Sequence, residues 1–447
     1  MASTKTLTFK VTRKNRELIS PAEPTPYGFK YLSDIDDQDC LRFRFPLIFF
    51  YRENISMKGK DPIKIIRDAV AKALVFYYPF AGRLRECDSR KLVVDCTGEG
   101  VVFVEADADV MLQQFGDALH PPFPNLEKLL LDTPDYDGTI NCPILFIQVT
   151  RLKCGGFILS YSCNHTICDA AGFVQFMSAV GELARGATAP SIQPVWERHL
   201  LTARNPPRVS FTHREYDVVP KTNGETDKMV VRYFFFDAAD ISALRRSLPR
   251  YLQTCSKFDI VAACAWRCRT IALSLKPDEE VVFVNTVNIR NKMKPPLPVG
   301  YYGNGIVFPA VVTTAKKLSE NPFQYAVELV MKGKYEATDD YVRSVADLMV
   351  MRDRPSVGAG MNYYIVSDTS TAGFEEVEVG WGKPVYGGVA KGTIDWIGVN
   401  WYIPFKNKKG EQGKIVTVCL PLNAMEEFAK QFRMMITAAR TLNLSAL

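Results

Sequence analysis

The order of apolar and polar residues divides the chain into many short strands and a smaller number of helices. Short runs that alternate between apolar and polar, or stay apolar throughout, are typical of β-strands. We expect strands at LTFKVT (7–12), PLIFF (46–50), LVVD (92–95), VVFVEA (101–106), ILFIQV (144–149), GFILSYS (156–162), VVRYFFF (230–236), VVFVNTVNI (281–289), NYYIVSD (362–368), NWYIPF (400–405) and KIVTVCL (414–420).

Helical spacing of apolar residues interrupts these strands. One helix is expected within residues 61–77, and a second has one apolar side made of Phe173, Phe176, Met177, Val180 and Leu183. Residues 256–273 are apolar nearly all round, as in a buried helix. Further helices are expected at 321–333, 339–350 and 423–440. This irregular mixture predicts an α/β fold with mixed sheets rather than a regular βαβ repeat.

Residues 185–216 form the best candidate for a boundary between domains. The segment is rich in proline and shows no periodicity, as expected of a long crossover linker. It divides the chain into an N-terminal domain, 1–184, and a C-terminal domain, 217–447, each long enough for its own core.

Composition excludes some classes of protein and leaves an ordinary globular chain. Of the 447 residues, 47% are hydrophobic, yet no run is long enough to span a membrane. The net charge of +6 comes from scattered basic residues, whereas a nucleic-acid protein would concentrate them in a stripe. Eleven cysteines without dense spacing, and no signal-like N-terminus, predict free thiols in the cytoplasm.

The stretch YSCNHTICDAAG contains the histidine that is best placed for chemistry. His165 is expected at the end of a strand, where a side chain can face a cleft, and histidine is the commonest general base. Asp169 stands just before a helix, a natural capping position. His165 as an ordinary polar residue at this junction remains an alternative. Cys163 as a nucleophile is a weaker alternative, since a buried free cysteine is far commoner.

Other candidate motifs favour structural roles. SKFD (256–259) predicts a capping box, in which Ser256 caps a helix and Asp259 reaches back. GYYGNG (300–305) and GGVAKG (387–392) do not join a strand to a helix and are interpreted as turns. In VEVGWGKP (377–384), glycines on both sides of Trp381 predict an unusual backbone path. The histidines and cysteines lack the spacing of a metal site.

Several ordered segments resemble the plant BAHD acyltransferases, which transfer acyl groups from coenzyme A to alcohols or amines. HTICD matches the family's H-x-x-x-D motif with His165 and Asp169, and VEVGWGKP stands where D-F-G-W-G is expected. YYPFAGRL, CSKFD, VNIRNKMKPPLPVGYYGN and VSDTSTAGF also follow in the family's order. The resemblance implies two similar chloramphenicol-acetyltransferase-like domains with mixed sheets and an active site in the channel at their interface.

The resemblance also implies residue roles. His165 would be the general base, and Trp381 would donate to the oxyanion, directly or from nearby. Asp169 would form an ion pair with Arg290, turned away from the reacting atoms. Glu378, Gly380 and Gly382 would shape the D-F-G-W-G-like segment, and Ser256 and Lys257 would contact CoA. Acyl-CoA would be a co-substrate, with no bound cofactor or metal. We expect a monomer that binds neither nucleic acid nor membrane.

Within the family, segments such as LSDIDDQ, VDCTGEGV and FIQVTRLKCGGF look most like benzyl alcohol benzoyltransferases, which implies benzoyl-CoA as the donor.

The sequence departs from the family's pattern in three places. Glu378 and Val379 replace the motif's aspartate and phenylalanine, and Lys257 replaces a usual threonine. The third is an aromatic segment that contains Asp395, Trp396, Asn400 and Trp401. A carboxylate and indole rings would suit a hydroxylated amine such as a tropane. A benzyl-type alcohol would need only an apolar pocket.

Two other function classes remain open on the sequence. The altered VEVGWG segment is compatible with a CoA- or ligand-binding protein that transfers nothing. Cys163 is compatible with a cysteine-dependent thioesterase. Release of CoA from benzoyl-CoA with and without alcohols separates these classes from an O-acyltransferase.

Overall fold

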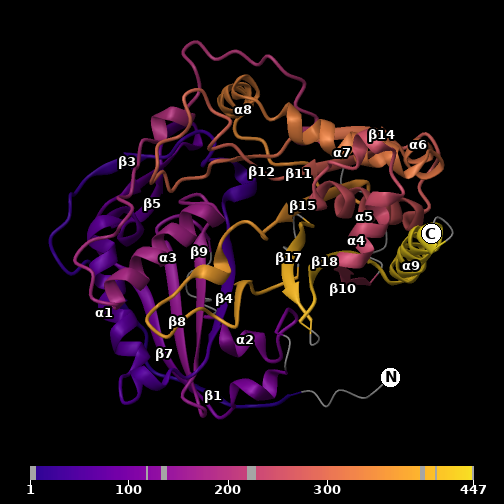
Figure 1. The fold of residues 1–447 in the computed structure, drawn as a ribbon. Coiled ribbons are helices and arrows are strands. Elements are labelled where there is room, and N and C mark those ends of the chain that lie inside the picture. The colour runs from indigo at the N-terminus through magenta and orange to yellow at the C-terminus, as the bar shows by residue number, and fades with distance from the viewer. Residues whose placement is uncertain are drawn as a thin grey trace.

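The structure is a computed structural model that describes residues 7–116, 119–131, 138–218, 228–392, 398–407 and 410–444. Two large mixed sheets, each covered by helices, lie side by side (Figure 1). This is the α/β architecture with mixed sheets that the sequence predicts. Within these residues no helix is long and apolar enough to cross a membrane. The division into domains 1–184 and 217–447 stays a prediction.

The first sheet has the strand order β1-β7-β8-β9-β4-β16, with β2 also paired to β7. Its strands are β1 (Val11–Arg13), β2 (Glu17–Ile19), β4 (Arg44–Tyr51), β7 (Val101–Ala108), β8 (Leu145–Leu152), β9 (Phe157–Asn164) and β16 (Tyr386–Val389). The β7–β8 pair is parallel and the other pairs are antiparallel. β9 therefore lies inside the sheet between β8 and β4, and its last residue leads directly into His165.

The second sheet has the strand order β10-β18-β17-β15-β11-β14. Its strands are β10 (Met229–Asp237), β11 (Glu280–Asn285), β14 (Ala310–Thr314), β15 (Tyr363–Asp368), β17 (Asn400–Lys406) and β18 (Gln412–Pro421). β15 pairs in parallel with β11 and β17. Two small sheets complete the described topology: β3 (Phe29–Tyr31), β6 (Leu92–Asp95) and β5 (Arg83–Glu86), and β12 (Val287–Asn288) with β13 (Ile306–Val307).

Among the described residues, helices form at all the places where the apolar spacing predicts them and at three others. They are α1 (Pro62–Phe76), α2 (Leu126–Leu129), α3 (Ala170–Ala184), α4 (Ala238–Arg246), α5 (Lys257–Leu273), α6 (Ala315–Glu320), α7 (Phe323–Glu336), α8 (Asp339–Met351) and α9 (Leu422–Leu444). All five apolar residues predicted for one side of α3 are buried. α5 is buried nearly all round, because α4, α6, α7 and α9 pack against it. The short helices α2, α4 and α6 were not predicted from the spacing.

One excursion of the chain links the two sheets. After β15 the chain crosses to the first sheet, where β16 pairs with β4, and it then returns to the second sheet as β17 (Figure 1). The sequence predicted a turn at GGVAKG, not a strand. Glycine permits the strand because a Cβ on Gly387 would lie 2.7 Å from both the Phe374 carbonyl oxygen and the Phe49 ring. Phe374, Val389 and Lys391 of this excursion line a cavity between the two sheets.

A candidate active site between the two sheets

His165 lies immediately after β9, at the strand end that the sequence predicts. Its backbone N–H donates to the Phe43 carbonyl at 2.8 Å, which continues the pairing of β9 with β4. The following turn is closed by Asn164, whose side-chain oxygen accepts from the amide of Thr166 at 3.1 Å and from its hydroxyl at 2.7 Å. An Asx turn of this kind ends the strand just before His165.

Two aromatic rings enclose the imidazole of His165. The Phe45 ring lies edge-on at a centroid distance of 4.8 Å and the Phe43 ring lies at 5.3 Å. Burial lowers the pKa of His165. A hydrogen bond with its own backbone, the charge of Asp169 and the Asn304 side chain each raise that pKa, but burial has the larger effect. The ring is therefore neutral near pH 7, as a general base must be.

Asn304, which does not line the cavity, contacts one ring nitrogen of His165. His165 Nδ1 lies 3.1 Å from Asn304 Oδ1, and the Asn304 amide nitrogen donates to the His165 carbonyl at 2.8 Å. Sequence reasoning missed this residue because GYYGNG was interpreted only as a turn. No local signal identifies it, since 139 positions separate the two residues.

Asp169 forms the ion pair with Arg290 that the resemblance implies. Its carboxylate oxygens lie 2.7 and 2.9 Å from the two terminal nitrogens of Arg290. It also accepts from the amides of Gly172 and Gly305, both at 2.9 Å, and the first of these contacts caps α3 as predicted. Burial alone would raise the pKa of Asp169, but Arg290 and the two amides hold it below its usual value.

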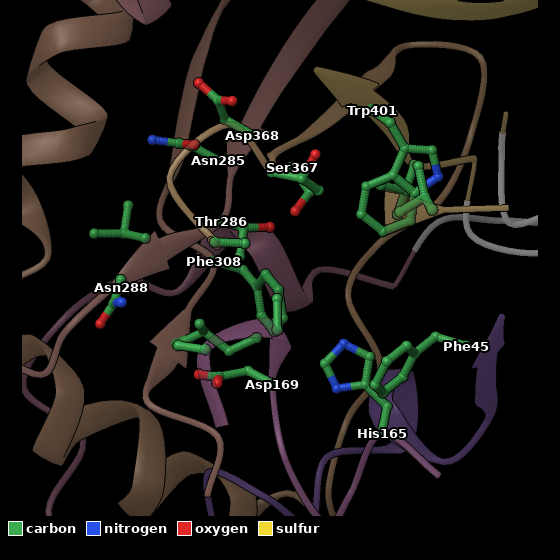
Figure 2. Close-up of a pocket in the computed structure, with 18 of the residues that line it drawn as sticks. Phe45, His165, Asp169, Asn285, Thr286, Asn288, Phe308, Ser367, Asp368 and Trp401 are labelled. Atoms are coloured by element: carbon green, nitrogen blue, oxygen red, sulfur yellow. The ribbon is translucent and has the colours of Figure 1, made fainter. Parts of the chain in front are cut away.

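Figure 2 shows that Asp169 and the His165 imidazole point in different directions. The four contacts of the Asp169 carboxylate are with Arg290 and with the Gly172 and Gly305 amides, and none is with the histidine. The geometry therefore fits the expectation that Asp169 is turned away from the reacting atoms.

A cavity of about 520 Å³ opens beside His165 between the two sheets. The residues before 185 that line it include Cys40, Leu41, Phe43, Phe45, Leu47, His165 and Asp169, and those after 216 include Ser256, Asn285, Thr286, Asn288, Lys292, Phe308, Lys334, Ile365, Ser367, Asp368, Lys391, Val399 and Trp401. Figure 2 shows the hydroxyl-bearing Thr286 and Ser367 in the same pocket as the imidazole. An apolar cavity of this size with a few polar groups suits a small organic substrate.

The N-terminal end of α5 borders the cavity through Ser256. Its side chain accepts from the Asp259 amide at 3.2 Å and the Asp259 carboxylate accepts from the Ser256 amide at 2.8 Å, which is the predicted capping box. Lys257, the other residue expected to contact CoA, is not among the residues that line the cavity. Lys292 and Lys334 line it instead, and Lys334 also contacts Asp259 at 2.8 Å. Sequence reasoning missed these two lysines.

The VEVGWG segment lies against the first sheet, far from His165. Trp381 packs edge-on against Phe157 at 5.4 Å. Phe157 begins β9 whereas His165 follows its end, so about 25 Å separates their Cα atoms at the usual rise of about 3.3 Å per residue. Trp381 is therefore not placed to donate to an oxyanion at His165, and the role that the resemblance implied for it is corrected.

The same segment has the unusual backbone that its glycines predict. Gly380 and Gly382 have φ angles of +100° and +87°, where other residues would be strained. The Glu378 carbonyl accepts from Arg185 at 2.6 Å, and its carboxylate lies 3.3 Å from the same guanidinium. The preceding carbonyl, of Val377, accepts from the buried Tyr51 hydroxyl at 2.9 Å. These contacts attach the chain excursion to the first sheet.

The expected acceptor residues that the structure describes lie in β17, and only one of them lines the cavity. Trp401 lines the cavity, as expected for the acceptor side. Asn400 does not: side chains alternate along a strand, and its amide donates to the carbonyls of Ile365 at 3.1 Å and Gly398 at 3.0 Å. Asp395 and Trp396 lie outside the described residues.

Cys163 is placed poorly for the thiol chemistry that the sequence left open. Its side chain is fully buried, lies 4.0 Å from the sulfur of Cys168, and is not among the residues lining the cavity. Burial among apolar groups is typical of a structural cysteine. Among the described residues, no group of three histidine, cysteine or acidic side chains has a geometry that could hold a metal ion.

A second histidine has the contacts of a catalytic triad but sits in the core. His213 lies 2.8 Å from both Glu215 Oε1 and Ser344 Oγ. The Ser344 hydroxyl also accepts from the amides of Ser210 and Phe211, and Ser344, His213 and Glu215 are all buried. The cluster attaches residues 210–215 of the predicted linker to α8 and does not line the cavity.

Comparisons with known proteins give a consistent assignment. The model of the Transferase family matches residues 9–435. Two relatives named benzyl alcohol O-benzoyltransferase, from Nicotiana tabacum and Petunia hybrida, are each 58% identical, over 95% and 96% of this chain and 93% and 94% of their own. A 13-hydroxylupanine O-tigloyltransferase from Lupinus albus is 50% identical over 96% of this chain and 95% of its own.

Solved structures share the fold. Vinorine synthase superposes with a TM-score of 0.71 at 22% identity, covering 94% of this chain and 96% of its own. TRI101 of F. sporotrichioides, complexed with coenzyme A and T-2, gives a TM-score of 0.69 at 16% identity over 90% and 97%. With the ordered motifs and the cavity beside His165, these matches show that the chain belongs to the Transferase family, the BAHD acyl-CoA-dependent acyltransferases.

Proposed function

We propose that this acyltransferase transfers the benzoyl group of benzoyl-CoA to a small neutral alcohol, preferably a benzyl-type alcohol. The observation that carries the proposal is a neutral histidine flanked by Phe43 and Phe45 at the wall of an apolar cavity shared by both sheets. The two relatives at 58% identity are named for benzoyl transfer to benzyl alcohol.

In the proposed mechanism, His165 Nε2 removes the proton from the acceptor hydroxyl as its oxygen attacks the thioester carbonyl. The C–O bond forms and the carbonyl electrons move to oxygen. The tetrahedral species then collapses, the C–S bond breaks, and His165 gives its proton to the CoA thiolate. The products are an ester and free CoA. A positioned general base contributes about 100- to 10,000-fold to such a reaction.

Thr286 and Ser367 replace Trp381 as the proposed donors to the oxyanion. Both hydroxyls line the cavity that contains His165, and within the described residues neither makes a hydrogen bond with protein (Figure 2). A hydroxyl without a protein partner can turn toward a developing negative charge without breaking a contact of the fold. Removing one oxyanion donor typically costs about 100- to 1,000-fold in kcat.

The phosphates of CoA are proposed to bind where Ser256, Lys292 and Lys334 line the cavity. The N-terminal end of α5 favours negative charge, and Lys292 adds to that field. Lys334 contributes less, because it is paired with Asp259 at 2.8 Å. Burial and the neighbouring Lys334 lower the pKa of Lys292, a penalty that a bound phosphate would relieve.

The charges in the cavity favour a neutral acceptor over a cationic one. Of the described lining residues, only Asp169 and Asp368 are acidic, and they are already paired with Arg290 and Lys414. A hydroxylated amine is the second candidate, because Trp401 lines the cavity and one relative is named for acylating 13-hydroxylupanine.

We also propose that the enzyme is a monomer of two domains, 1–184 and 217–447, located in the cytoplasm. One chain supplies both walls of the cavity, so no second copy is needed to complete the site. All eleven cysteines are free, as is usual in a reducing compartment.

The test is to incubate pure protein with benzoyl-CoA, with and without a panel of alcohols. CoA and ester are measured by mass spectrometry, because the exposed Cys87 would react with a thiol reagent. Release of CoA that depends on alcohol and matches ester formation supports the proposal. Release without alcohol would indicate a thioesterase, and binding without release would indicate a ligand-binding protein.

A further inference from the structure

Asn304 connects the proposed base to a buried carboxylate far away in the sequence. Its backbone amide donates to Asp36 Oδ1 at 2.8 Å, and its side-chain nitrogen donates to the same oxygen at 2.9 Å. That nitrogen also donates to the His165 carbonyl at 2.8 Å, and its side-chain oxygen faces His165 Nδ1 at 3.1 Å. Both Asn304 and Asp36 are fully buried.

These contacts determine which way the Asn304 amide points. The Asp36 carboxylate and the His165 carbonyl can only accept hydrogen bonds, so the group facing them must be the NH₂. The Asn304 oxygen is then left to face the imidazole. Because this oxygen can only accept, Nδ1 must carry the ring proton, and in the neutral ring Nε2 keeps its lone pair.

We propose that Asn304 and Asp36 are positioning residues that hold His165 as the Nδ1–H tautomer, so that Nε2 is the base toward the substrate. Neither residue lines the cavity, and both act through the histidine. The inference rests on the proposed function of His165. It adds a cause for the ring's tautomer beside the hydrogen bond that the ring makes with its own backbone. Asp169 does not supply this cause, because its carboxylate is bound to Arg290 and two amides.

Asp36 is itself held in place from the predicted linker. Arg198 lies 3.3 Å from Asp36 Oδ1 and donates to the Ile167 carbonyl at 2.8 Å, two residues after His165. Its guanidinium also lies over the rings of Trp196 at 4.3 Å and Tyr302 at 4.9 Å. The orientation of the asparagine is thus set by a charged oxygen that cannot rotate away.

The first measurement is the ring tautomer in the unliganded protein. The chain has four histidines, so a long-range ¹H–¹⁵N spectrum of protein labelled at histidine is simple enough to assign, with His165→Gln identifying the signal of interest. We expect the Nδ1–H pattern for His165 in the wild type and a shift toward Nε2–H in Asn304→Ala. This readout needs no substrate, so it remains decisive even if benzoyl transfer itself is not observed.

The second measurement is steady-state kinetics with benzoyl-CoA and benzyl alcohol. Asn304→Ala should lower kcat by at least about 10-fold and by up to about 10,000-fold, the loss seen when a catalytic histidine is left in the wrong tautomer, with little change in either KM. Asp36→Asn should give a smaller loss, since an amide oxygen can still accept from Asn304. Asp37→Asn is the matched control: Asp37 is equally buried and pairs with Arg42 and Arg354, but does not contact Asn304.

The outcomes are distinct. A wild-type His165 with the Nε2–H pattern overturns the inference, as does an Asn304→Ala enzyme with unchanged tautomer and kcat. Equal losses in Asp36→Asn and Asp37→Asn, in proportion to their melting temperatures, also overturn it, because they indicate only destabilisation. If Asn304→Ala does not fold, the wild-type spectrum and the Asp36→Asn kcat decide the question.

Discussion

Replacing Asp169 with alanine should weaken the fold and the activity together. The substitution removes the cap of α3 and the acceptor for two amides, and it leaves the Arg290 guanidinium without its carboxylate. Only 5% of the Asp169 side chain and 19% of the Arg290 side chain are exposed, so water compensates little for the lost partner. A direct catalytic role for Asp169 would instead predict lost activity at unchanged stability.

The size of the effect follows from these contacts. Removing one partner of a buried ion pair costs about 3–5 kcal/mol. Arg290 keeps two acceptors, the Gly303 carbonyl at 2.8 Å and the Asn288 side-chain oxygen at 3.5 Å, which reduce the cost of the unpaired charge. We therefore expect Asp169→Ala to lower the free energy of unfolding by about 3 kcal/mol. Arg290→Ala should cost somewhat less, because the Gly172 and Gly305 amides still satisfy the carboxylate.

Urea unfolding followed by circular dichroism measures this free energy, and Asp61→Ala is a matched control. Asp61 caps α1, a helix as long as α3, and also pairs with an arginine, Arg151 at 2.6 Å. Its side chain is 43% exposed, so we expect only the loss of a cap, about 1 kcal/mol. The Asp169→Ala, Arg290→Ala double variant should lose less than the sum of the two single losses, since each single variant leaves the other group unpaired.

Two results would refute this reasoning. Asp169→Ala with wild-type stability and no turnover would show that its carboxylate acts on the reacting atoms. Strict additivity in the double variant would show that the ion pair contributes nothing beyond its separate contacts.

The remaining predictions concern the cavity. His165→Ala should lose at least about 100-fold in kcat while still binding benzoyl-CoA in a calorimetric titration, and near-normal turnover would exclude it as the base. Cys163→Ser should stay active, because its sulfur lies outside the cavity, and a folded but inactive variant would revive the thiol mechanism. Since burial lowers the pKa of His165, the acid limb of kcat/KM should have its midpoint below the ordinary histidine value of about 6.5; a midpoint above it would contradict the neutral, enclosed ring. In competition at fixed benzoyl-CoA, benzyl alcohol should be esterified in preference to a tropane alcohol; an amine preference that disappears in Trp401→Phe would instead support the cation-binding acceptor site. Thr286→Val or Ser367→Ala should lower kcat by about 100-fold or more without a comparable rise in KM, and normal kcat in both would place the oxyanion donor elsewhere.

The sequence by itself determined the longer helices, the main strands and the positions of His165 and Asp169 relative to them. Apolar spacing predicted α1, α3, α5, α7, α8 and α9, and the alternating runs predicted the main strands, because these periods follow from backbone geometry alone. The positions of His165 at a strand end and of Asp169 at a helix cap were also predictable, since both depend on neighbours within a few residues. The ordered motifs identified the family.

Only the tertiary structure decided which distant residues meet. β16 has two glycines and no strand pattern, and it is a strand because β4 offers an edge to pair with. The resemblance implied that Trp381 donates to the oxyanion, and its contact with Phe157, at the opposite end of β9 from His165, corrects this. Asn304 and Asp36 lie in segments that carry the family resemblance, but no local pattern indicates that they meet, because their hydrogen bond joins positions 268 residues apart. Such contacts depend on how the sheets and loops pack in three dimensions, and no local pattern in a single sequence records that packing.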